Sequence, residues 1–194
     1  MHYYSSVADI YRANEEVRAR LIARVEALDE ETQNFRAGEQ AWTVAEIVEH
    51  LATLEHRLSQ LAAMMVGKAE SVAAAAAGGD AATGGGDGAA GGAPHFKPFS
   101  LEEQVEQART QKFVAPDEVR PRGGLSVADS LARLRKSRAA FEALRPRVER
   151  VDLSAATYPH PAFGPLNLYQ WLAFIGIHEQ RHLDQIERLL ASRG

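Results

Sequence analysis

The sequence contains no cysteine. Disulfide bonds, thiolate nucleophiles and cysteine-based zinc sites are therefore excluded for this chain. Long apolar runs are also missing, because the longest extends only from Trp171 to Ile177 and is too short to cross a bilayer. The first residues show no basic segment followed by an apolar run, so no secretory signal is expected. We expect a cytoplasmic protein with no membrane partner.

Neither sign of charge dominates the composition. Asp and Glu number 26 and Lys and Arg 22, which gives a formal net charge of −4. The basic residues are mixed with acidic ones along the chain rather than gathered in one patch, so no nucleic-acid partner is expected. Hydrophobic residues make up 45% of the 194 positions, enough for a single domain, residues 1–194, with its own core.

Alternating runs of β-branched residues, which mark half-buried strands, are absent. Apolar residues recur instead at steps of three and four, which is typical of amphipathic helices in a bundle. Long helices are expected over about residues 7–28, 43–65, 126–148 and 168–191, with a short polar helix over about 100–112. The predicted fold class is all-α, a four-helix bundle.

Two of the helix starts carry capping signals. Thr43 and Glu46 form a T-x-x-E capping box, and Asn167 with Gln170 three residues later is a similar pair. Charged residues in the first helix, Arg18 among them, are expected to face water. Arg138 interrupts the apolar face of the third helix, and its guanidinium is expected to extend to solvent.

Residues 69–94 differ in composition from the rest of the chain. An alanine run from Ala73 to Ala77 is followed by eight glycines within a few positions of one another. Such a stretch offers no large side chain to bury, so a flexible insertion is predicted. A glycine-rich loop can also cradle phosphate, but it then follows a strand and opens a helix. Neither flanks this stretch, so the linker interpretation is preferred.

Three histidines stand out against the helical pattern. His178 and His182 are four residues apart, so they share one helix face, and they occupy positions where the pattern predicts leucine. His50 lies beside the apolar seam of the second long helix. Three buried imidazoles without partners would be costly, whereas a divalent metal ion would accept a lone pair from each. The sequence therefore predicts a metal site of His50, His178 and His182.

The segment from His178 to His182 also matches H-E-x-x-H, the helix signature of zinc proteases in which the glutamate is the general base. Those enzymes take a third ligand from sequence after the motif, but the twelve residues that follow here contain no histidine. The third ligand available is His50, upstream. We therefore expect Glu179 to point away from the metal, and the protease interpretation is not favoured.

In order and spacing, several short motifs resemble those of the DinB-like (damage-inducible) superfamily, and they cover most of the chain outside the Ala/Gly stretch. They are Trp42-Thr43 at a helix start, Glu49-His50-Leu51, His160-Pro161-x-x-Gly164-x-Leu166, and His178-x-x-x-His182-x-x-Gln185-Ile186.

This resemblance implies an up-down-down-up bundle with a long crossover between the second and third helices. It implies that the three histidines bind zinc, nickel or a similar divalent ion, and that the protein is a homodimer. Some members of the superfamily transfer low-molecular-weight thiols to electrophiles, and many others are labelled metal-dependent hydrolases of unknown substrate. A small-molecule substrate, in some members a thiol, is therefore the expected partner.

Other residues are candidates for supporting roles. Glu46, Glu179 and Asp184 are close in sequence to the histidines and are expected to accept their second ring N–H. His160 is either a general acid or base at the pocket mouth or a residue that simply packs in its loop. Two functions stay open: a metal-dependent thiol S-transferase or hydrolase, and a non-catalytic metal-binding bundle that acts in stress response or as a dimeric interaction module.

Overall fold

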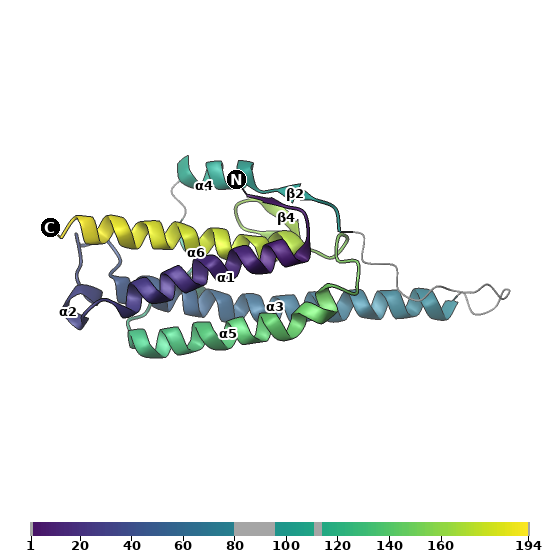
Figure 1. The fold of residues 1–194 in the computed structure, drawn as a ribbon, viewed down its shortest axis with the longest axis horizontal. Helices are drawn as coiled ribbons and strands as arrows, with labels where there is room; N and C mark the ends of the chain where they lie inside the picture. The colour runs from purple at the N-terminus through teal and green to yellow at the C-terminus, as the bar shows by residue number, and fades with distance from the viewer. Residues whose placement is uncertain (1, 80–95, 111–113, 194) are drawn as a thin grey trace.

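Four long helices form the body of the molecule in the computed structural model, which describes residues 2–79, 96–110 and 114–193 (Figure 1). They are α1 (Val7–Glu26), α3 (Val44–Gly79), α5 (Val127–Val148) and α6 (Leu168–Ala191). Shorter elements join them: α2 (Glu30–Gln33), α4 (Glu102–Thr110) and the 3-10 turn η1 (Asp117–Val119). The predicted four-helix bundle is confirmed.

The order of the helices in the bundle is up-down-down-up. The colour gradient in Figure 1 shows that α1 and α6 run in one direction and that α3 and α5 both run in the other. Because α3 and α5 are parallel, the chain must return along the whole bundle between them, and α4 and η1 lie on this crossover. In the packing, α1 contacts α6 and α3 contacts α5 most extensively.

Two of the long helices begin with reciprocal capping boxes, as the sequence predicts. The Thr43 hydroxyl accepts a hydrogen bond from the Glu46 N–H, and the Glu46 carboxylate accepts one from the Thr43 N–H. Asn167 and Gln170 form the same pair of bonds at the start of α6. These bonds satisfy N–H groups that have no partner within the helix, so they fix where α3 and α6 begin.

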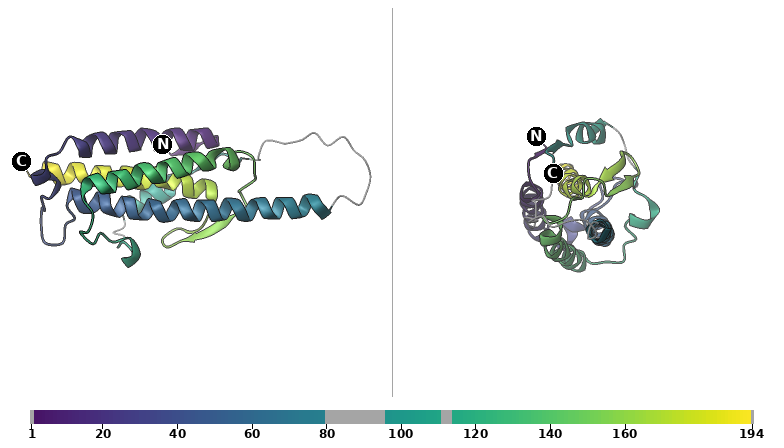
Figure 2. Two further views of the ribbon diagram at one scale, coloured as in Figure 1. Left: turned by 90° about the horizontal axis from the view of Figure 1, so that it is seen from below. Right: turned by 90° about the vertical axis from the view of Figure 1, so that its right-hand side faces the viewer.

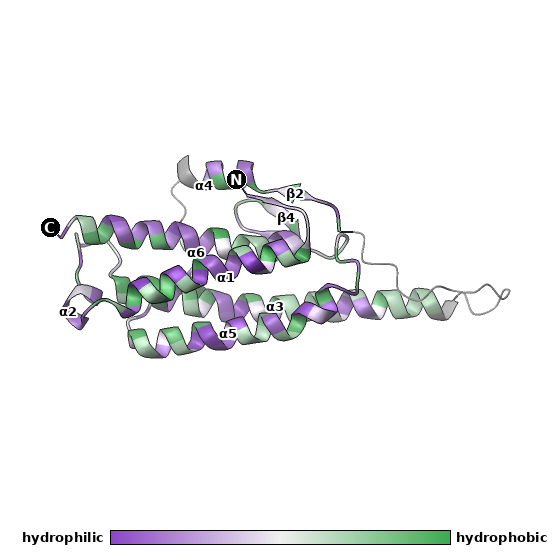
Figure 3. Cartoon of the chain, in the orientation of Figure 1, coloured by the Kyte–Doolittle hydropathy of each residue, from purple (hydrophilic) through white to green (hydrophobic). Residues whose placement is uncertain are grey.

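Apolar side chains fill the space between the helices in two clusters. One surrounds Ile10 and Leu172 at the end where α1 and α6 begin, and the other surrounds Leu21, Ile47 and Ile186 at the opposite end. Hydrophobic and hydrophilic positions alternate along each helix, as Figure 3 shows. Among the described residues, no helix combines the length and apolar character needed to cross a membrane.

In the part of the chain that the structure describes, four short strands accompany the helices. Strand β1 (Tyr3–Tyr4) pairs with β2 (Phe99–Ser100), and β3 (Thr157–His160) pairs with β4 (Gly164–Asn167) in a hairpin. The sequence predicted no strand pattern and placed His160 in a loop. The hairpin escaped prediction because most of its residues are exposed, so they show no alternation of apolar and polar positions. Viewed along the bundle axis, the hairpin and η1 lie beside α3 and α6 (Figure 2).

The structure corrects the expected start of the Ala/Gly insertion, residues 69–94. Helix α3 continues to Gly79, so residues 69–79 are helical and extend beyond the ends of the other long helices (Figure 1). Alanine has the highest helix propensity of all residues, which explains why Ala73–Ala77 prolongs the helix. The rest of the predicted insertion, residues 80–94, lies outside the described residues.

Helix α1 approaches α6 closely at Gly176. A Cβ atom at this position would lie 2.3 Å from Asn14 Oδ1 and 3.3 Å from Asn14 Cα. Asn14 cannot easily move, because it is buried and its Nδ2 donates a hydrogen bond to the Leu172 carbonyl at 2.9 Å. Glycine at position 176 therefore allows the two helices to pack at this distance, two residues before His178.

We expect Gly176→Ala to lower the free energy of unfolding by about 1–3 kcal/mol, because overpacking outweighs the better helix propensity of alanine. Urea denaturation measures the change. Gly67→Ala in α3 is the matched control, since nothing lies within 4 Å of the position that its added methyl group would occupy. That variant should be more stable by about 0.4–1 kcal/mol. Equal effects of the two substitutions would show that the close approach has no energetic consequence.

Candidate metal centre

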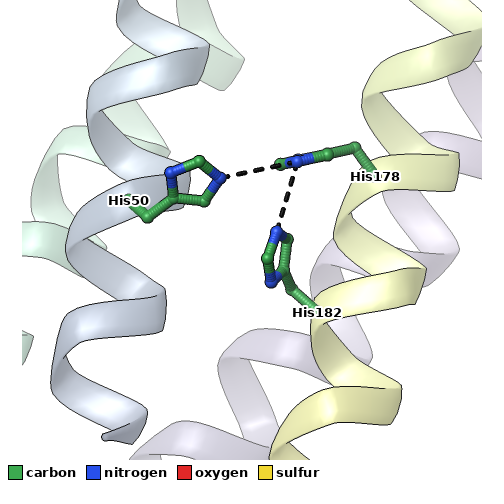
Figure 4. Close-up of side chains that lie close together, drawn as sticks. All are labelled: His50, His178 and His182. Atoms are coloured by element: carbon green, nitrogen blue, oxygen red, sulfur yellow. Dashed lines mark hydrogen bonds between the residues drawn. The ribbon is translucent and has the colours of Figure 1, made fainter. Parts of the chain in front are cut away.

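Helices α3 and α6 bring the three predicted histidines together. His50 extends from α3, and His178 and His182 extend from successive turns of α6 toward it (Figure 4). His178 Nε2 lies 3.5 Å from His50 Nε2 and 3.2 Å from His182 Nε2. One nitrogen from each ring falls within 4.8 Å of the others. His50 and His182 are buried, whereas His178 is half-buried at the edge of a cleft.

Hydrogen bonds at Nδ1 orient two of these rings. His50 Nδ1 lies 2.7 Å from the Val119 carbonyl oxygen, and His182 Nδ1 lies 2.9 Å from Gln185 Oε1. Both partners are acceptors, so in each ring Nδ1 carries the proton and Nε2 presents a lone pair. The lone pairs of His50 and His182 thus face the same small space as the ring of His178.

The loop that carries Val119 is held by the residue next to His50. The Glu49 carboxylate is buried and accepts hydrogen bonds from the backbone N–H groups of Arg122 and Gly123, at 3.1 and 2.9 Å. Gly123 has a φ of +69°, which glycine adopts without strain. Glu49 therefore holds this loop by accepting two of its N–H groups, and His50 Nδ1 donates a hydrogen bond to its Val119 carbonyl.

Burial keeps the three imidazoles neutral. Desolvation lowers the pKa of His50, although the bond to Val119 opposes the change. Desolvation, with a smaller contribution from His182 and His50, lowers the pKa of His178 well below its usual value. Desolvation together with His50 lowers the pKa of His182 to about 3. All three rings are therefore in the form that binds a metal ion at neutral pH.

The arrangement fits a divalent metal ion. Two nitrogens bound to the same tetrahedral zinc at ~2.0–2.1 Å lie about 3.4 Å apart, and the separations of 3.2 and 3.5 Å are on either side of this value. His178 Nε2 could donate a proton to the Nε2 atom of either His50 or His182, but not to both. At the other contact, two nitrogen lone pairs would then face each other. A cation bound between the rings would relieve this repulsion, and imidazole suits zinc, nickel, copper and iron.

The carboxylates predicted to support the histidines have other partners, which corrects that expectation. Glu46 accepts from the Thr43 N–H and pairs with Arg36 at 2.7 Å, and Asp184 accepts from Gln180 on the exposed side of α6. Glu179 points into the bundle and pairs with Arg18. Val119 and Gln185 take the expected role instead.

The position of Glu179 also bears on the H-E-x-x-H match. As expected, its side chain points away from the three-histidine cluster; it is 1% exposed and does not line the cleft. A general base must reach the water or substrate that it deprotonates. Among the described residues, Glu179 is therefore not placed as the general base of a zinc protease.

His160 lies in the hairpin and lines the same cleft. Its ring packs against Phe163 and Phe174, both with centroids 4.6 Å away, and its Nδ1 accepts a hydrogen bond from the Ala162 N–H at 3.1 Å. Burial lowers the pKa of His160 to about 4, so the ring is neutral with its proton on Nε2. Of the two expectations for His160, these contacts agree with the one in which its ring packs within the loop.

A cleft with a volume of about 1770 Å³ opens beside the three histidines. It is lined by residues of α3 and α6 and is bordered by the β3–β4 hairpin and the segment 114–120. Both tryptophans of the chain, Trp42 and Trp171, line it. The histidine cluster is thus reachable from solvent by a small molecule.

Comparison with known proteins gives three kinds of similarity. The uncharacterised protein YuaE of Bacillus subtilis is 32% identical over 87 residues, which is 44% of this chain and 53% of YuaE, so the chain spans about half the length of this relative. TT2238, a four-helix bundle protein, has a TM-score of 0.58 at 20% identity, with 94% of this chain and 99% of TT2238 covered.

YfiT from Bacillus subtilis is described as a probable metal-dependent hydrolase with an unusual four-helix bundle topology. Its TM-score is 0.53 at 18% identity, with 94% of this chain and 85% of YfiT covered. At these identities the two solved structures show a shared fold. The family model of the DinB superfamily matches residues 13–186, nearly the whole chain. This protein therefore belongs to the DinB superfamily.

Proposed function

We propose that this protein is a metal-dependent hydrolase that acts on a small molecule in the cleft beside His178. The observation that carries the proposal is the convergence of three neutral imidazoles at the edge of an open cleft. When bound there, a divalent ion, for which zinc or nickel is our choice, would act as a Lewis acid toward water and substrate. The description of YfiT, which shares the fold, agrees with this assignment.

The residues of the chain have distinct parts in this proposal. His50, His178 and His182 hold the ion without adding negative charge, so its full charge is available to the substrate. The bonds to Val119 and Gln185 fix the direction of two ligating nitrogens. The aromatic residues of the hairpin and of α6 cover one side of the cleft and reduce the access of bulk water.

Thiol S-transfer is the second candidate. Among the described residues that line the cleft, Glu118 is the only carboxylate, and His160 is packed against aromatic rings. A reaction that needs no protein base suits such a site, because a metal ion can stabilise a thiolate directly. The chain has no cysteine, so the thiol would come from a cosubstrate.

Elemental analysis of protein purified without a histidine tag tests the metal site. We expect about one divalent ion per chain in the wild type and at least a tenfold lower content in His50→Ala and His182→Ala, since each loses one of three ligands. His56→Ala is the matched control, because His56 is an exposed histidine of α3 outside the cluster. Circular dichroism should show similar helix content in all four proteins. A His182→Ala protein that retains stoichiometric metal would contradict the assignment.

Activity then separates the candidate functions. Ester and amide hydrolysis, and the reaction of low-molecular-weight thiols with an electrophile, are assayed with and without a chelator. Chelator-sensitive hydrolysis that is lost in His182→Ala supports the hydrolase. Chelator-sensitive conjugation alone would favour the S-transferase. Stoichiometric metal without either activity would favour a non-catalytic metal-binding bundle.

A further inference from the structure

One face of α6 changes character along the cleft. Six residues separated by steps of three and four point to the same side of the helix and all line the cleft. They are Trp171, Phe174, His178, Arg181, Gln185 and Arg188. The face therefore begins with aromatic rings, passes the histidine cluster at His178 and ends with two arginines.

The aromatic end of the cleft is closed by the hairpin. The His160 ring lies 5.1 Å from Trp171 and 4.6 Å from Phe174, and Phe163 stacks on His160. Tyr158 contacts Trp171 and is 44% exposed. These aromatic rings together can stack on, and make apolar contact with, a flat hydrophobic group.

The opposite end of the face is cationic. Arg181 is half-buried and Arg188 is exposed, and the described residues offer Arg188 no ion-pair partner. Five arginines in total line the cleft, of which Arg120 pairs with Asp117, and Glu118 is the one described carboxylate there, although the whole chain has a net charge of −4. A cleft of this sign attracts anions, and planar guanidinium groups bind carboxylates through paired hydrogen bonds.

The spacing of the two ends sets a length for the ligand. A helix rises about 1.5 Å per residue, so Arg181 lies about 10 Å along the axis from Phe174 and about 15 Å from Trp171, and Arg188 lies about 10 Å beyond Arg181. His178 is between them. A molecule that contacts both ends passes directly over the histidine cluster.

We propose that the substrate is an amphipathic acid, with an aromatic group against Trp171 and Phe174, a carboxylate at Arg181 that the charge of Arg188 also attracts, and its reacting bond between them at His178. That this ligand is a substrate rests on the proposed metal-dependent activity. The binding preference itself depends on the aromatic and cationic ends of the cleft and not on the metal.

The test uses the full chain stripped of metal with a chelator, so that a carboxylate cannot bind through an ion. The probes are 6-phenylhexanoate, the neutral 6-phenylhexanamide and hexanoate, which lacks the ring. Intrinsic fluorescence reports binding, because both tryptophans lie in the cleft. We expect 6-phenylhexanoate to bind at least about tenfold more tightly than either other probe, since charge-assisted hydrogen bonds and ring stacking each contribute about that factor.

Variants assign the preference to the two ends. In Arg181→Gln/Arg188→Gln the acid and the amide should bind within about twofold of each other, because the charged partners are gone. Arg188→Gln alone, at an exposed position that tolerates substitution, should lose part of the preference. Phe174→Leu should weaken the acid and the amide equally. Arg12→Gln, at an exposed arginine of α1 outside the cleft, is the matched control and should bind like the wild type.

The result that overturns the inference is equal affinity of the wild type for acid and amide, or a preference that persists in the double variant. Either result leaves the metal site unaffected, since metal content is measured separately. A charge preference in a protein that binds no metal would support the amphipathic ligand and overturn the proposed hydrolase.

Discussion

Replacing Arg18 with methionine is expected to lower the free energy of unfolding by about 3–5 kcal/mol, the usual cost of removing one partner from a buried ion pair. Arg18 lies on α1 and pairs with Glu55 of α3 and Glu179 of α6, and its Nη1 donates to the Leu134 carbonyl of α5 at 3.0 Å. The three side chains are 1–4% exposed. A single cation thus connects all four long helices.

The size of this effect follows from the two buried carboxyl groups that share Arg18 as their cation. The pKa of Glu179 lies well above its usual value, mainly because the group is buried and secondly because Glu55 is close to it. Among the described residues, Glu55 Oε2 and Glu179 Oε2 have no hydrogen-bond partner, so Arg18 supplies most of the polar contacts that these groups have. Methionine fills a similar volume but leaves both groups buried without a cation.

Urea denaturation of two further variants identifies the cause. Arg18→Met/Glu55→Gln/Glu179→Gln should recover most of the lost stability, because it removes the charges as well as their partner. Arg24→Met is the matched control: Arg24, also on α1, pairs with Glu187 of α6 at the surface at 2.8 Å, and such pairs contribute about 0–1 kcal/mol. Similar losses in Arg18→Met and Arg24→Met would show that the buried network has no special role. Arg138 does not serve here, because its side chain, expected to extend to solvent, is only 15% exposed and its Nη2 donates to the Tyr11 carbonyl at 3.1 Å.

Arg18 also shows where sequence reasoning reached its limit. It was expected to face water, but Arg18 is 3% exposed, whereas its apolar neighbour Val17 is only half-buried. The true seam of α1 passes through Asn14 and Arg18, and a pattern that counts only apolar residues selects the neighbouring position. The sequence signal for this network is that Arg18, Glu55 and Glu179 each stand at core-like spacing on a different helix. That signal can be interpreted only when their contacts are known.

In the metal centre, too, some residues could be predicted from the sequence and others could not. His50, His178 and His182 could be predicted, because they stand at or beside positions where a helical seam predicts leucine. The groups that orient them could not, since Val119 acts through a backbone carbonyl on a distant loop, which has no sequence signature. Glu46 was a poor candidate for a further reason: the capping box with Thr43, itself recognised from the sequence, already occupies its carboxylate.

The metal-free protein is expected to lose stability steeply on mild acidification. The pKa values of His50, His178 and His182 are lowered by burial, so the unfolded chain, with histidine pKa values near 6.5, binds protons before the folded one does. The stability that the neutral rings provide is therefore present above about pH 6.5 and falls as the pH decreases toward the folded pKa values. With a folded pKa of about 3, His182 alone should cost about 2 kcal/mol between pH 7 and pH 5, and the other two rings act in the same direction.

Denaturation in urea with a chelator at pH 7, 6 and 5 measures this dependence, and His50→Leu/His178→Leu/His182→Leu provides the comparison. The triple variant should have a much flatter profile and should be at least as stable at pH 7, because leucine satisfies the apolar seam that the histidines interrupt. Parallel losses in the two proteins would place the acid sensitivity elsewhere. A wild type that is less stable without metal than its leucine variant would mean that this fold tolerates three imidazoles at core positions for their chemistry, since packing alone favours leucine there.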